Sequence, residues 1–142
     1  MKIYMDNCCF NRPYDDQTQL KIYLETQAKL NIQKQIITGK HELVWSFILD
    51  YKNEQNPFEM RKNSIKDWRS IAKLYILLND DVTTFARMLL GKGIKNKDAL
   101  HIACAVEAKC NVFFTTDKKL LNTLIPEIRI MNPLEFIIEM EE

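Results

Sequence analysis

The amino-acid sequence predicts an α/β protein whose central, mainly parallel sheet is covered by helices on both faces. Short apolar runs typical of buried strands alternate along the chain with longer segments in which apolar residues recur at helical spacing. Acidic residues follow two of the apolar runs directly, as polar residues do at the carboxyl ends of parallel strands. Alternation of this kind is typical of sheets that are buried on both faces.

Length and composition predict a single domain over residues 1–142. A chain of 142 residues with 46% hydrophobic and 27% charged residues is typical of a globular protein. Its net charge of +1 gives no global argument for or against binding to nucleic acid. The amino terminus lacks the apolar region of a signal peptide, and no apolar run approaches the ~20 residues that cross a bilayer. We therefore expect a cytoplasmic protein without membrane contact.

Four cysteines, at positions 8, 9, 104 and 110, form no C-x-x-C pair. A bridge between adjacent Cys8 and Cys9 would be strained. We expect free thiols in a reducing compartment. The spacing supports neither a zinc site nor a nucleophilic cysteine.

The first third of the chain predicts a strand, a loop and a long helix. Residues 2–5 read as a buried strand that ends at Asp6, and residues 11–16 as a loop in which Asp15 or Asp16 caps the next helix. That helix runs to about Ile36. Its apolar face is expected to hold Leu20, Tyr23, Leu24 and Ala28.

The middle of the chain predicts a strand over residues 42–45, an N-cap at Ser46 and a helix over residues 47–54. Pro57 ends that segment and begins another helix. Its apolar positions are Ile65, Trp68, Ala72 and Tyr75. Residues 74–78 fit the end of this helix or a third strand, and periodicity does not decide between them.

The last third predicts three helices and two strands before a final helix. The cap cluster 79–81 precedes a helix over residues 82–90 that Gly91 and Gly93 close. Asn96 is expected to cap a buried helix that runs to about Ala108. Then come a strand at 112–115, a short helix at 117–124, a strand at 128–131 and a helix from Pro133.

Four carboxylates are expected at one edge of this sheet. Asp6 and Asp117 follow strands, while Asp50 and Asp98 lie in the first turns of helices that can pack over the same edge. Clustered carboxylates repel unless a cation offsets them, and Mg²⁺ or Mn²⁺ prefers oxygen ligands. The chemistry indicated is hydrolysis of phosphodiester bonds by metal-activated water.

Each acid also has a plain structural explanation. Asp98 offsets a helix dipole, Asp117 fits an N-cap and Asp6 simply ends a strand. Asp50, with Glu54 one turn later, fits a solvated surface. His101 lies on the same helix as Asp98, and we interpret it as a packed, hydrogen-bonded residue because a metal-water mechanism needs no imidazole.

Four segments together resemble the PIN-domain family of metal-dependent nucleases, which includes VapC-type toxins. They are Ile3-Tyr4-Met5-Asp6, Trp45-Ser46-Phe47-Ile48-Leu49-Asp50-Tyr51, Lys97-Asp98-Ala99-Leu100-His101-Ile102-Ala103 and Phe114-Thr115-Thr116-Asp117. The resemblance implies that Asp6, Asp98 and Asp117 bind metal. Asp50 lies where the family's second acid, usually Glu, is expected, and being one methylene shorter it would hold metal through water. Lys52 and Glu54 are close enough to leave the register of that acid open.

The resemblance further implies supporting roles for Thr115 and for Asn7, which stands where Ser or Thr usually follows the first acid. It also implies a three-layer α/β/α sandwich, Mg²⁺ or Mn²⁺ as cofactor, RNA as substrate, a homodimer and a small antitoxin as partner. The expected function is thus an endoribonuclease, the toxin of a toxin–antitoxin pair. Residues that could hold the phosphate backbone are Arg12, Lys95, Lys97 and Lys118, although the lysines also fit a solvated helix end.

Two other functions compete with this one. A PIN-like domain that no longer binds metal productively would act as a module that binds RNA or protein. A phosphatase of the haloacid dehalogenase type needs a second Asp two positions after the first, where Cys8 stands, and is set aside. Tyr51, Phe58, Met60 and Trp68 could form a docking groove, but we expect core packing.

Overall fold

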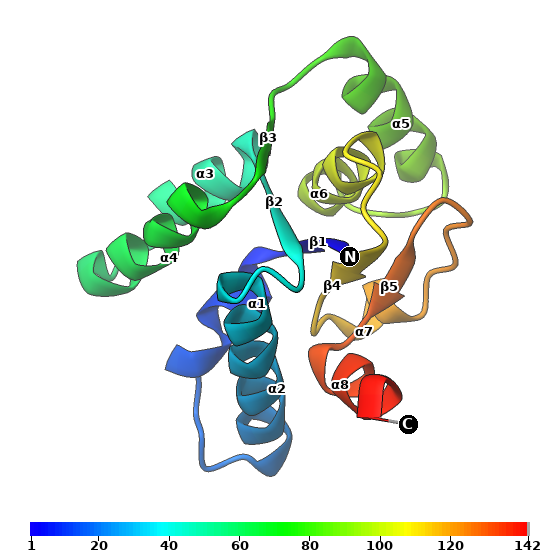
Figure 1. The fold of residues 1–142 in the computed structure, drawn as a ribbon. Coiled ribbons are helices and arrows are strands. Elements are labelled where there is room, and N and C mark those ends of the chain that lie inside the picture. Colours follow the sequence, from blue (N-terminus) through cyan, green and yellow to red (C-terminus); the bar gives the residue numbers. More distant parts are fainter. Residues whose placement is uncertain (142) are drawn as a thin grey trace.

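The central sheet has five parallel strands, seen here in a computed structural model that describes residues 1–141 (Figure 1). They are β1 (Lys2–Met5), β2 (Glu42–Ser46), β3 (Leu74–Ile76), β4 (Val112–Phe114) and β5 (Arg129–Met131), arranged in the order β3-β2-β1-β4-β5. The predicted parallel sheet is therefore confirmed. β1 lies at its centre, with Met5 in register with Phe114 of β4.

Helices cover both faces of the sheet, so the predicted three-layer arrangement is confirmed. Two of them, α2 and α8, pack together on one face, while α6 packs with α5 and α3 on the other (Figure 1). The helical segments are α1 (Asn7–Asn11), the 3₁₀ helix η1 (Arg12–Tyr14), α2 (Leu20–Ile37), α3 (Phe47–Glu54), α4 (Glu59–Ile71), α5 (Asp80–Gly91), α6 (Asn96–Glu107), α7 (Lys118–Leu121) and α8 (Pro133–Glu141).

Aromatic side chains fill the core on either side of β1. Tyr4 is fully buried, stacks on Phe113 with ring centroids 5.3 Å apart and meets the edge of His101 at 5.6 Å. On the opposite face Phe114 packs against Phe136 of α8 at 5.0 Å. Alternation along the strands thus sends neighbouring residues into two separate apolar layers.

The expected apolar face of α2 is wrong. Leu20 is 70% exposed, and Tyr23 and Leu24 are exposed as well, whereas Ala28 is buried. The helix instead buries polar side chains, Glu25 among them, beside Ile32 and Ile36. Glu25 can be buried because Arg12 pairs with it at 2.8 Å and Asn132 donates a hydrogen bond to it.

Two other expectations in this part of the chain are corrected. The segment predicted as a loop, residues 11–16, contains the end of α1 and the whole of η1. Neither Asp15 nor Asp16 caps α2, whose N-cap position is held by Gln19 without a side-chain bond. Asp16 instead accepts hydrogen bonds from the backbone and hydroxyl of Thr18, at 3.0 and 2.6 Å, which satisfies the turn before the helix.

The expected helix after Pro57 is shorter than predicted. α4 ends at Ile71, and the open choice for residues 74–78 is resolved as a strand, because Leu74, Tyr75 and Ile76 pair with β2. Core packing is wrong for three of the four side chains assigned to it. Tyr51 and Phe58 are each 52% exposed and Met60 is 86% exposed, while Trp68 packs against the core.

Most predicted caps and boundaries hold. Ser46 accepts a hydrogen bond from the Leu49 amide at 3.3 Å, and Asn79 caps α5 by accepting one from Val82 at 2.9 Å. Lys95 rather than Asn96 holds the N-cap position of α6. The four cysteines are free thiols. No helix within residues 1–141 has both the length and the apolar character needed to cross a membrane.

Candidate metal centre

Asp6 and Asp117 meet at the carboxyl edge of the sheet because β1 and β4 are neighbours. Met5 pairs with Phe114, and the Asp6 amide donates to the Phe114 carbonyl at 3.1 Å. Two residues beyond Phe114 the chain turns, and the Asp117 amide donates to the Thr115 hydroxyl at 3.1 Å. Thr115 is fully buried and so fixes the backbone that carries Asp117.

Asp98 reaches the same edge from the first turn of α6. With Asp117 and Lys95 it lines a cavity of about 90 Å³. Burial raises the pKa of Asp98, the charge of Lys52 opposes this, and the charges of Asp117 and Cys8 raise it further. The acids from α6 and the β4 end are therefore close enough to repel one another.

Asp6 is the most buried of these three acids, at 6% exposure. Its side chain caps α1 by accepting a hydrogen bond from the Cys9 amide at 3.2 Å. Burial raises the pKa of Asp6 well above its usual range, and the neighbouring Cys8 raises it further. A cation placed beside this carboxylate would relieve the cost of holding it ionised.

Cys8 lies between the ends of β1 and β4, a position that no pattern in the sequence predicted. Its Sγ is 2.6 Å from Asp6 Oδ1 and accepts hydrogen bonds from the amide and hydroxyl of Thr116, at 3.3 and 3.1 Å. Cys9 Sγ, a carboxylate oxygen of Asp6 and Cys8 Sγ all lie within 4.8 Å of one another. The signal that could have shown this is Asp6 acting as a helix N-cap, which turns α1 back over the strand ends.

Asp50 is a correction to the predicted site. Its Oδ1 accepts a hydrogen bond from Trp45 Nε1 at 2.8 Å, and its Oδ2 accepts one from the Tyr75 hydroxyl. Arg69 of α4 lies 3.6 Å from the same Oδ2. Because both oxygens are already engaged by β2, β3 and α4, the structure does not support Asp50 as a metal ligand, directly or through water.

Lys52 is the side chain of α3 that acts on the acids. Two residues along a helix turn the side-chain direction by roughly 200°, so Lys52 lies on the side opposite Asp50. Its positive charge lowers the pKa of both Asp98 and His101. A lysine thus stands near the place expected for a carboxylate, and the register of the second acid stays a prediction.

Of the residues predicted to hold phosphate, Arg12 is corrected. Its guanidinium donates to Glu25 at 3.0 Å and to Asp15 at 3.0 Å, so it is already paired inside the protein. Lys95, Lys97 and Lys118 are exposed, and Lys95 lines the cavity between Asp98 and Asp117. Lys97 Nζ lies 5.4 Å from the ring centre of Tyr51. Lys119 lines the same cavity as Lys95.

His101 has the packing role that the sequence suggested. Its Nδ1 is 2.6 Å from the Tyr4 hydroxyl, which is also 2.6 Å from Ser46 Oγ. Burial lowers the pKa of His101 to about 3, so the imidazole is neutral near pH 7. A neutral, fully buried ring that is bonded to Tyr4 is not placed to exchange protons with substrate.

The donor atoms present fit a divalent cation that prefers oxygen. Asp6, Asp98 and Asp117 supply carboxylates from three chain segments. Burial and Cys8 raise the pKa of Asp6, and burial, Asp117 and Cys8 raise that of Asp98, a cost that a cation would offset. Asn7 is 93% buried, and its Oδ1 has no hydrogen-bond partner within residues 1–141. Carboxylate and amide oxygens are the ligands that Mg²⁺ and Mn²⁺ take.

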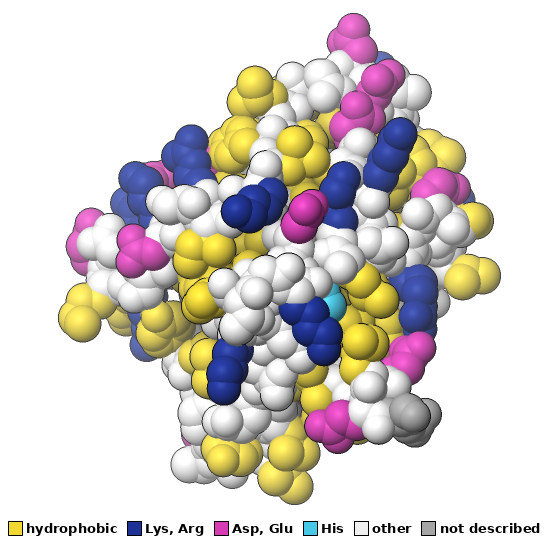
Figure 2. Space-filling view, viewed as in Figure 1, with side chains coloured by type: hydrophobic (Ala, Val, Ile, Leu, Met, Phe, Trp, Pro, Cys, Tyr) yellow, Lys and Arg dark blue, Asp and Glu magenta, His cyan; other side chains and the backbone are white. Residues whose placement is uncertain are grey.

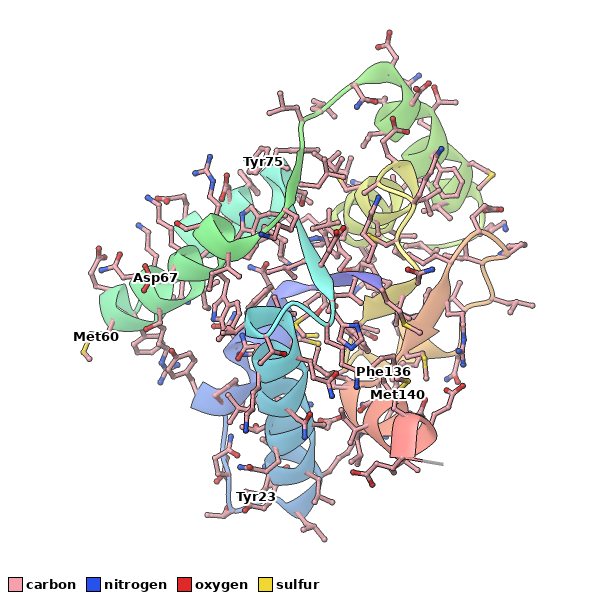
Figure 3. All side chains as sticks on the ribbon, in the orientation of Figure 1. Tyr23, Met60, Asp67, Tyr75, Phe136 and Met140 are labelled. Atoms are coloured by element: carbon pink, nitrogen blue, oxygen red, sulfur yellow. The ribbon has the colours of Figure 1, made fainter. Side chains whose placement is uncertain are left out.

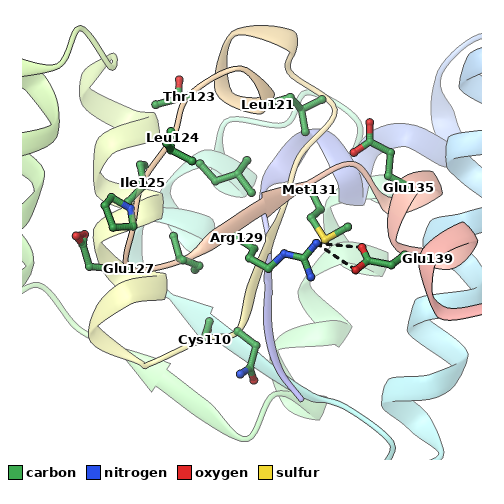
Figure 4. Close-up of a pocket in the computed structure, with 14 residues that line it drawn as sticks. Cys110, Leu121, Thr123, Leu124, Ile125, Glu127, Arg129, Met131, Glu135 and Glu139 are labelled. Carbon is green, nitrogen blue, oxygen red and sulfur yellow. Dashed lines mark hydrogen bonds and ion pairs between the residues drawn. The ribbon is translucent and has the colours of Figure 1, made fainter.

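A larger hollow lies elsewhere on the surface. It measures about 710 Å³ between β5, the loop before it and α8, and the ion pair of Arg129 with Glu139 borders it at 3.0 Å (Figure 4). None of the three acids lines it. The volume of this hollow is therefore no guide to the place where the charged side chains lie.

Comparison with known proteins supports the fold. No family model matches the chain, and no curated protein matches it. Among solved structures it is similar to VapBC2 from Rickettsia felis, bound to a DNA fragment from its promoter, with a TM-score of 0.58 and 17% identity over 93% of this chain and 98% of that one. VapBC-1 from nontypeable Haemophilus influenzae gives a TM-score of 0.53 and 17% identity over 94% and 98%. The predicted PIN-like fold is confirmed by these likenesses.

Proposed function

We propose that this protein is a metal-dependent endoribonuclease that hydrolyses RNA phosphodiester bonds. The observation that carries the proposal is that Asp6, Asp98 and Asp117 lie at one edge of the sheet, where burial raises the pKa of Asp6 and Asp98 and the charge of Asp117 raises that of Asp98 further. Carboxylates in such a cluster favour a bound cation. The likeness in fold to VapBC structures supports the same reading.

In this proposal each residue of the edge has a definite task. Asp6, Asp98 and Asp117 hold Mg²⁺ or Mn²⁺, and Asn7 offers its free amide oxygen. When bound, the metal supplies a Lewis acid that activates water and stabilises charge on the phosphate. Thr115 keeps Asp117 in place through the 3.1 Å bond to its amide.

Substrate binding is assigned to the lysines around the acids. Lys95 and Lys119 line the cavity beside Asp98 and Asp117, where an ammonium group would contact a phosphate oxygen. Lys97 and Lys118 are exposed near the same helix ends and extend the positive surface along which RNA would lie. Arg12 has no part in this, because Glu25 and Asp15 occupy its guanidinium.

The partner proposed for this enzyme is a small antitoxin protein. Two solved structures similar to this chain are those of VapBC2 and VapBC-1, and the likeness covers 93% and 94% of the chain. We place the protein in the cytoplasm and assign it a homodimeric state, in line with the resemblance.

The test is cleavage of structured RNA by the purified protein with added Mn²⁺. Asp98→Asn should abolish cleavage, whereas Asp67→Asn, at an exposed position on α4, should leave it unchanged (Figure 3). Equal cleavage by Asp98→Asn and the wild type would overturn the proposal.

A binding module without catalysis is the second candidate, favoured by one observation. The fourth carboxylate is absent from the cluster, since Asp50 is engaged elsewhere and Lys52 acts on Asp98 instead. Calorimetry with Mn²⁺ separates the two candidates. RNA binding without metal uptake would favour the module.

A further inference from the structure

A small cavity lies between α2, α4 and η1, away from the three acids. It measures about 190 Å³ and is walled by apolar residues, including Phe10, Ile65 and Trp68. Two polar side chains of α2, Lys29 and Gln33, also line it. They stand four residues apart on the helix and therefore share one face.

Lys29 is a buried cation without a partner. It is 5% exposed, and no carboxylate within residues 1–141 forms an ion pair with it. Its Nζ lies 5.6 Å from the ring centre of Phe10, and burial lowers the pKa of Lys29 to about 8. Buried ammonium groups are costly unless an acceptor is supplied.

Gln33, one turn further along α2, also lacks a hydrogen-bond partner. It is 4% exposed, and its Nε2 has no acceptor within the described part of the chain. Two unsatisfied donors on one helix face that border the same hollow are unusual, because buried polar groups in proteins are nearly always paired. Together they define a place for an acceptor with negative charge.

A second cation and exposed apolar surface lie beside the cavity. Arg61 of α4 lies over the rings of Tyr14 and Phe58, at 5.1 and 3.9 Å, and it too forms no ion pair within residues 1–141. Leu30 of α2 and Met60 of α4 are exposed on either side. Hydrophobic side chains are visible at the free end of α4 and at the lower end of α2 (Figure 2), and Met60 projects from the α4 end (Figure 3).

We propose that this cavity receives the carboxylate of an acidic side chain from a partner protein, with Lys29 and Gln33 as its donors. The proposal rests on the proposed function only in that the small antitoxin would be this partner. Charge complementarity selects a carboxylate, since Lys29 and Arg61 both lack an anion.

The size of the cavity and its rim select a protein as the source of that carboxylate. A hollow of 190 Å³ is smaller than the pockets of roughly 300 Å³ and more that enclose whole ligands, so it fits one side chain. The exposed Leu30, Phe58 and Met60 extend the apolar surface beyond the hollow. Residues that flank an inserted acid would cover them.

Heteronuclear NMR titration tests this with two blocked tripeptides, Leu-Glu-Leu and Leu-Gln-Leu. We expect saturable shifts of the Trp68 indole and Gln33 side-chain signals with Leu-Glu-Leu, and affinity at least about tenfold weaker for Leu-Gln-Leu. Equal binding of both peptides would overturn the proposal that the cavity binds a carboxylate. If acetate or inorganic phosphate bound as tightly as Leu-Glu-Leu, the proposal that a protein supplies the carboxylate would be overturned.

Three variants make the assignment to this cavity specific. Lys29→Met should abolish binding of Leu-Glu-Leu, Gln33→Leu should weaken it several-fold, and Lys34→Met, at an exposed position on the same helix, should leave it unchanged. Lys29→Met should also raise the melting temperature of the free protein, because it removes an unpaired buried charge. Binding retained by a folded Lys29→Met protein would overturn the proposal.

The nuclease assay is run on the same proteins to keep the two proposals apart. Lys29→Met should cleave RNA like the wild type, because its cavity is separate from Asp98 and Asp117. A wild-type protein that binds Leu-Glu-Leu but cuts no RNA would contradict the proposed function alone. A protein that cuts RNA but shows no preference for Leu-Glu-Leu would contradict the docking site alone.

Discussion

Trp45 Nε1 donates a hydrogen bond of 2.8 Å to Asp50 Oδ1, and this contact separates Asp50 from the other three acids. Trp45 is fully buried at the centre of the sheet, so its N–H needs an acceptor inside the protein. Asp50 provides it and also accepts from Tyr75 of the neighbouring strand. The carboxylate joins β2 to β3, and we predict that it takes no part in metal binding.

Asp50→Ala should therefore lower stability and spare metal binding. The indole N–H and the Tyr75 hydroxyl would lose their acceptor, at a cost of about 1–3 kcal/mol in the free energy of unfolding. Denaturant unfolding measures this, with Glu54→Ala as a control, since Glu54 is exposed and its pair with Lys62 lies at the surface. Loss of Mn²⁺ binding at unchanged stability would return Asp50 to the metal site.

Asp98→Asn should instead raise the stability of the metal-free protein. The pKa of Asp98 is raised by burial and by Asp117 and Cys8, so its ionised form near pH 7 is held at a cost. A carboxyl whose pKa rises on folding stabilises the fold at low pH and loses that contribution as the pH rises through its folded pKa. The melting temperature of Asp98→Asn in EDTA should thus exceed that of the wild type at pH 7.

With added Mn²⁺ the wild type should have the higher melting temperature, because ligand binding stabilises only the protein that can bind the ligand. The wild type should gain thermal stability with Mn²⁺ and Asp98→Asn should not. A stabilising effect of Mn²⁺ that is the same in both proteins would exclude Asp98 as a ligand.

Cys8 should be the most reactive thiol of the folded chain. It is partly exposed, whereas Cys9, Cys104 and Cys110 are buried. A brief reaction with iodoacetamide, followed by peptide mapping, should find the label at Cys8, and Mn²⁺ should slow the reaction because Asp6 Oδ1 lies 2.6 Å from the sulfur. Equal labelling of the buried cysteines, or no effect of Mn²⁺, would contradict the geometry.

Lys52→Glu should strengthen metal binding. The change puts a carboxylate where a positive charge now acts on Asp98, and added ligand charge raises cation affinity. We expect affinity for Mn²⁺ to rise by about tenfold in calorimetry, with a lower melting temperature for the metal-free protein. Lys66→Glu on the exposed surface of α4 is the control for net charge. Unchanged affinity would place Lys52 outside the centre.

The position of Asp6 and Asp117 at the same edge of the sheet could be predicted from the sequence for a simple physical reason. Buried parallel strands end at a common edge, and the residue after each strand then falls beside its neighbour. The position of Asp98 could be predicted as well, because α6 begins near the same edge of the sheet and carries this acid in its first turn. These predictions depend on strand ends, which are set by local patterns.

The predictions that failed concern which face of a helix points inward, and the rotation of a helix about its own axis decides this. For α3, the side that faces the acids is decided by the bonds of Asp50 to Trp45 and Tyr75, which lie in two strands. For α2, the buried face is decided by the pairing of Glu25 with Arg12 and Asn132. Partners so distant along the chain leave no periodic pattern, and the apolar residues of α2 predicted the wrong face.

The pH dependence of stability tests the unpaired state of Lys29 directly. Burial lowers the pKa of Lys29 to about 8 from its ordinary 10.5, so between these values the unfolded chain binds more protons than the folded one. Stability therefore rises with pH across this window, and it is lost again as the pH falls through 8. In denaturant unfolding, the wild type should gain roughly 3 kcal/mol relative to Lys29→Met from pH 8 to 10.5. Saturation with Leu-Glu-Leu should remove this gain, because a paired carboxylate restores the pKa. A difference between the two proteins that does not change with pH would show that Lys29 already has a partner in the free protein.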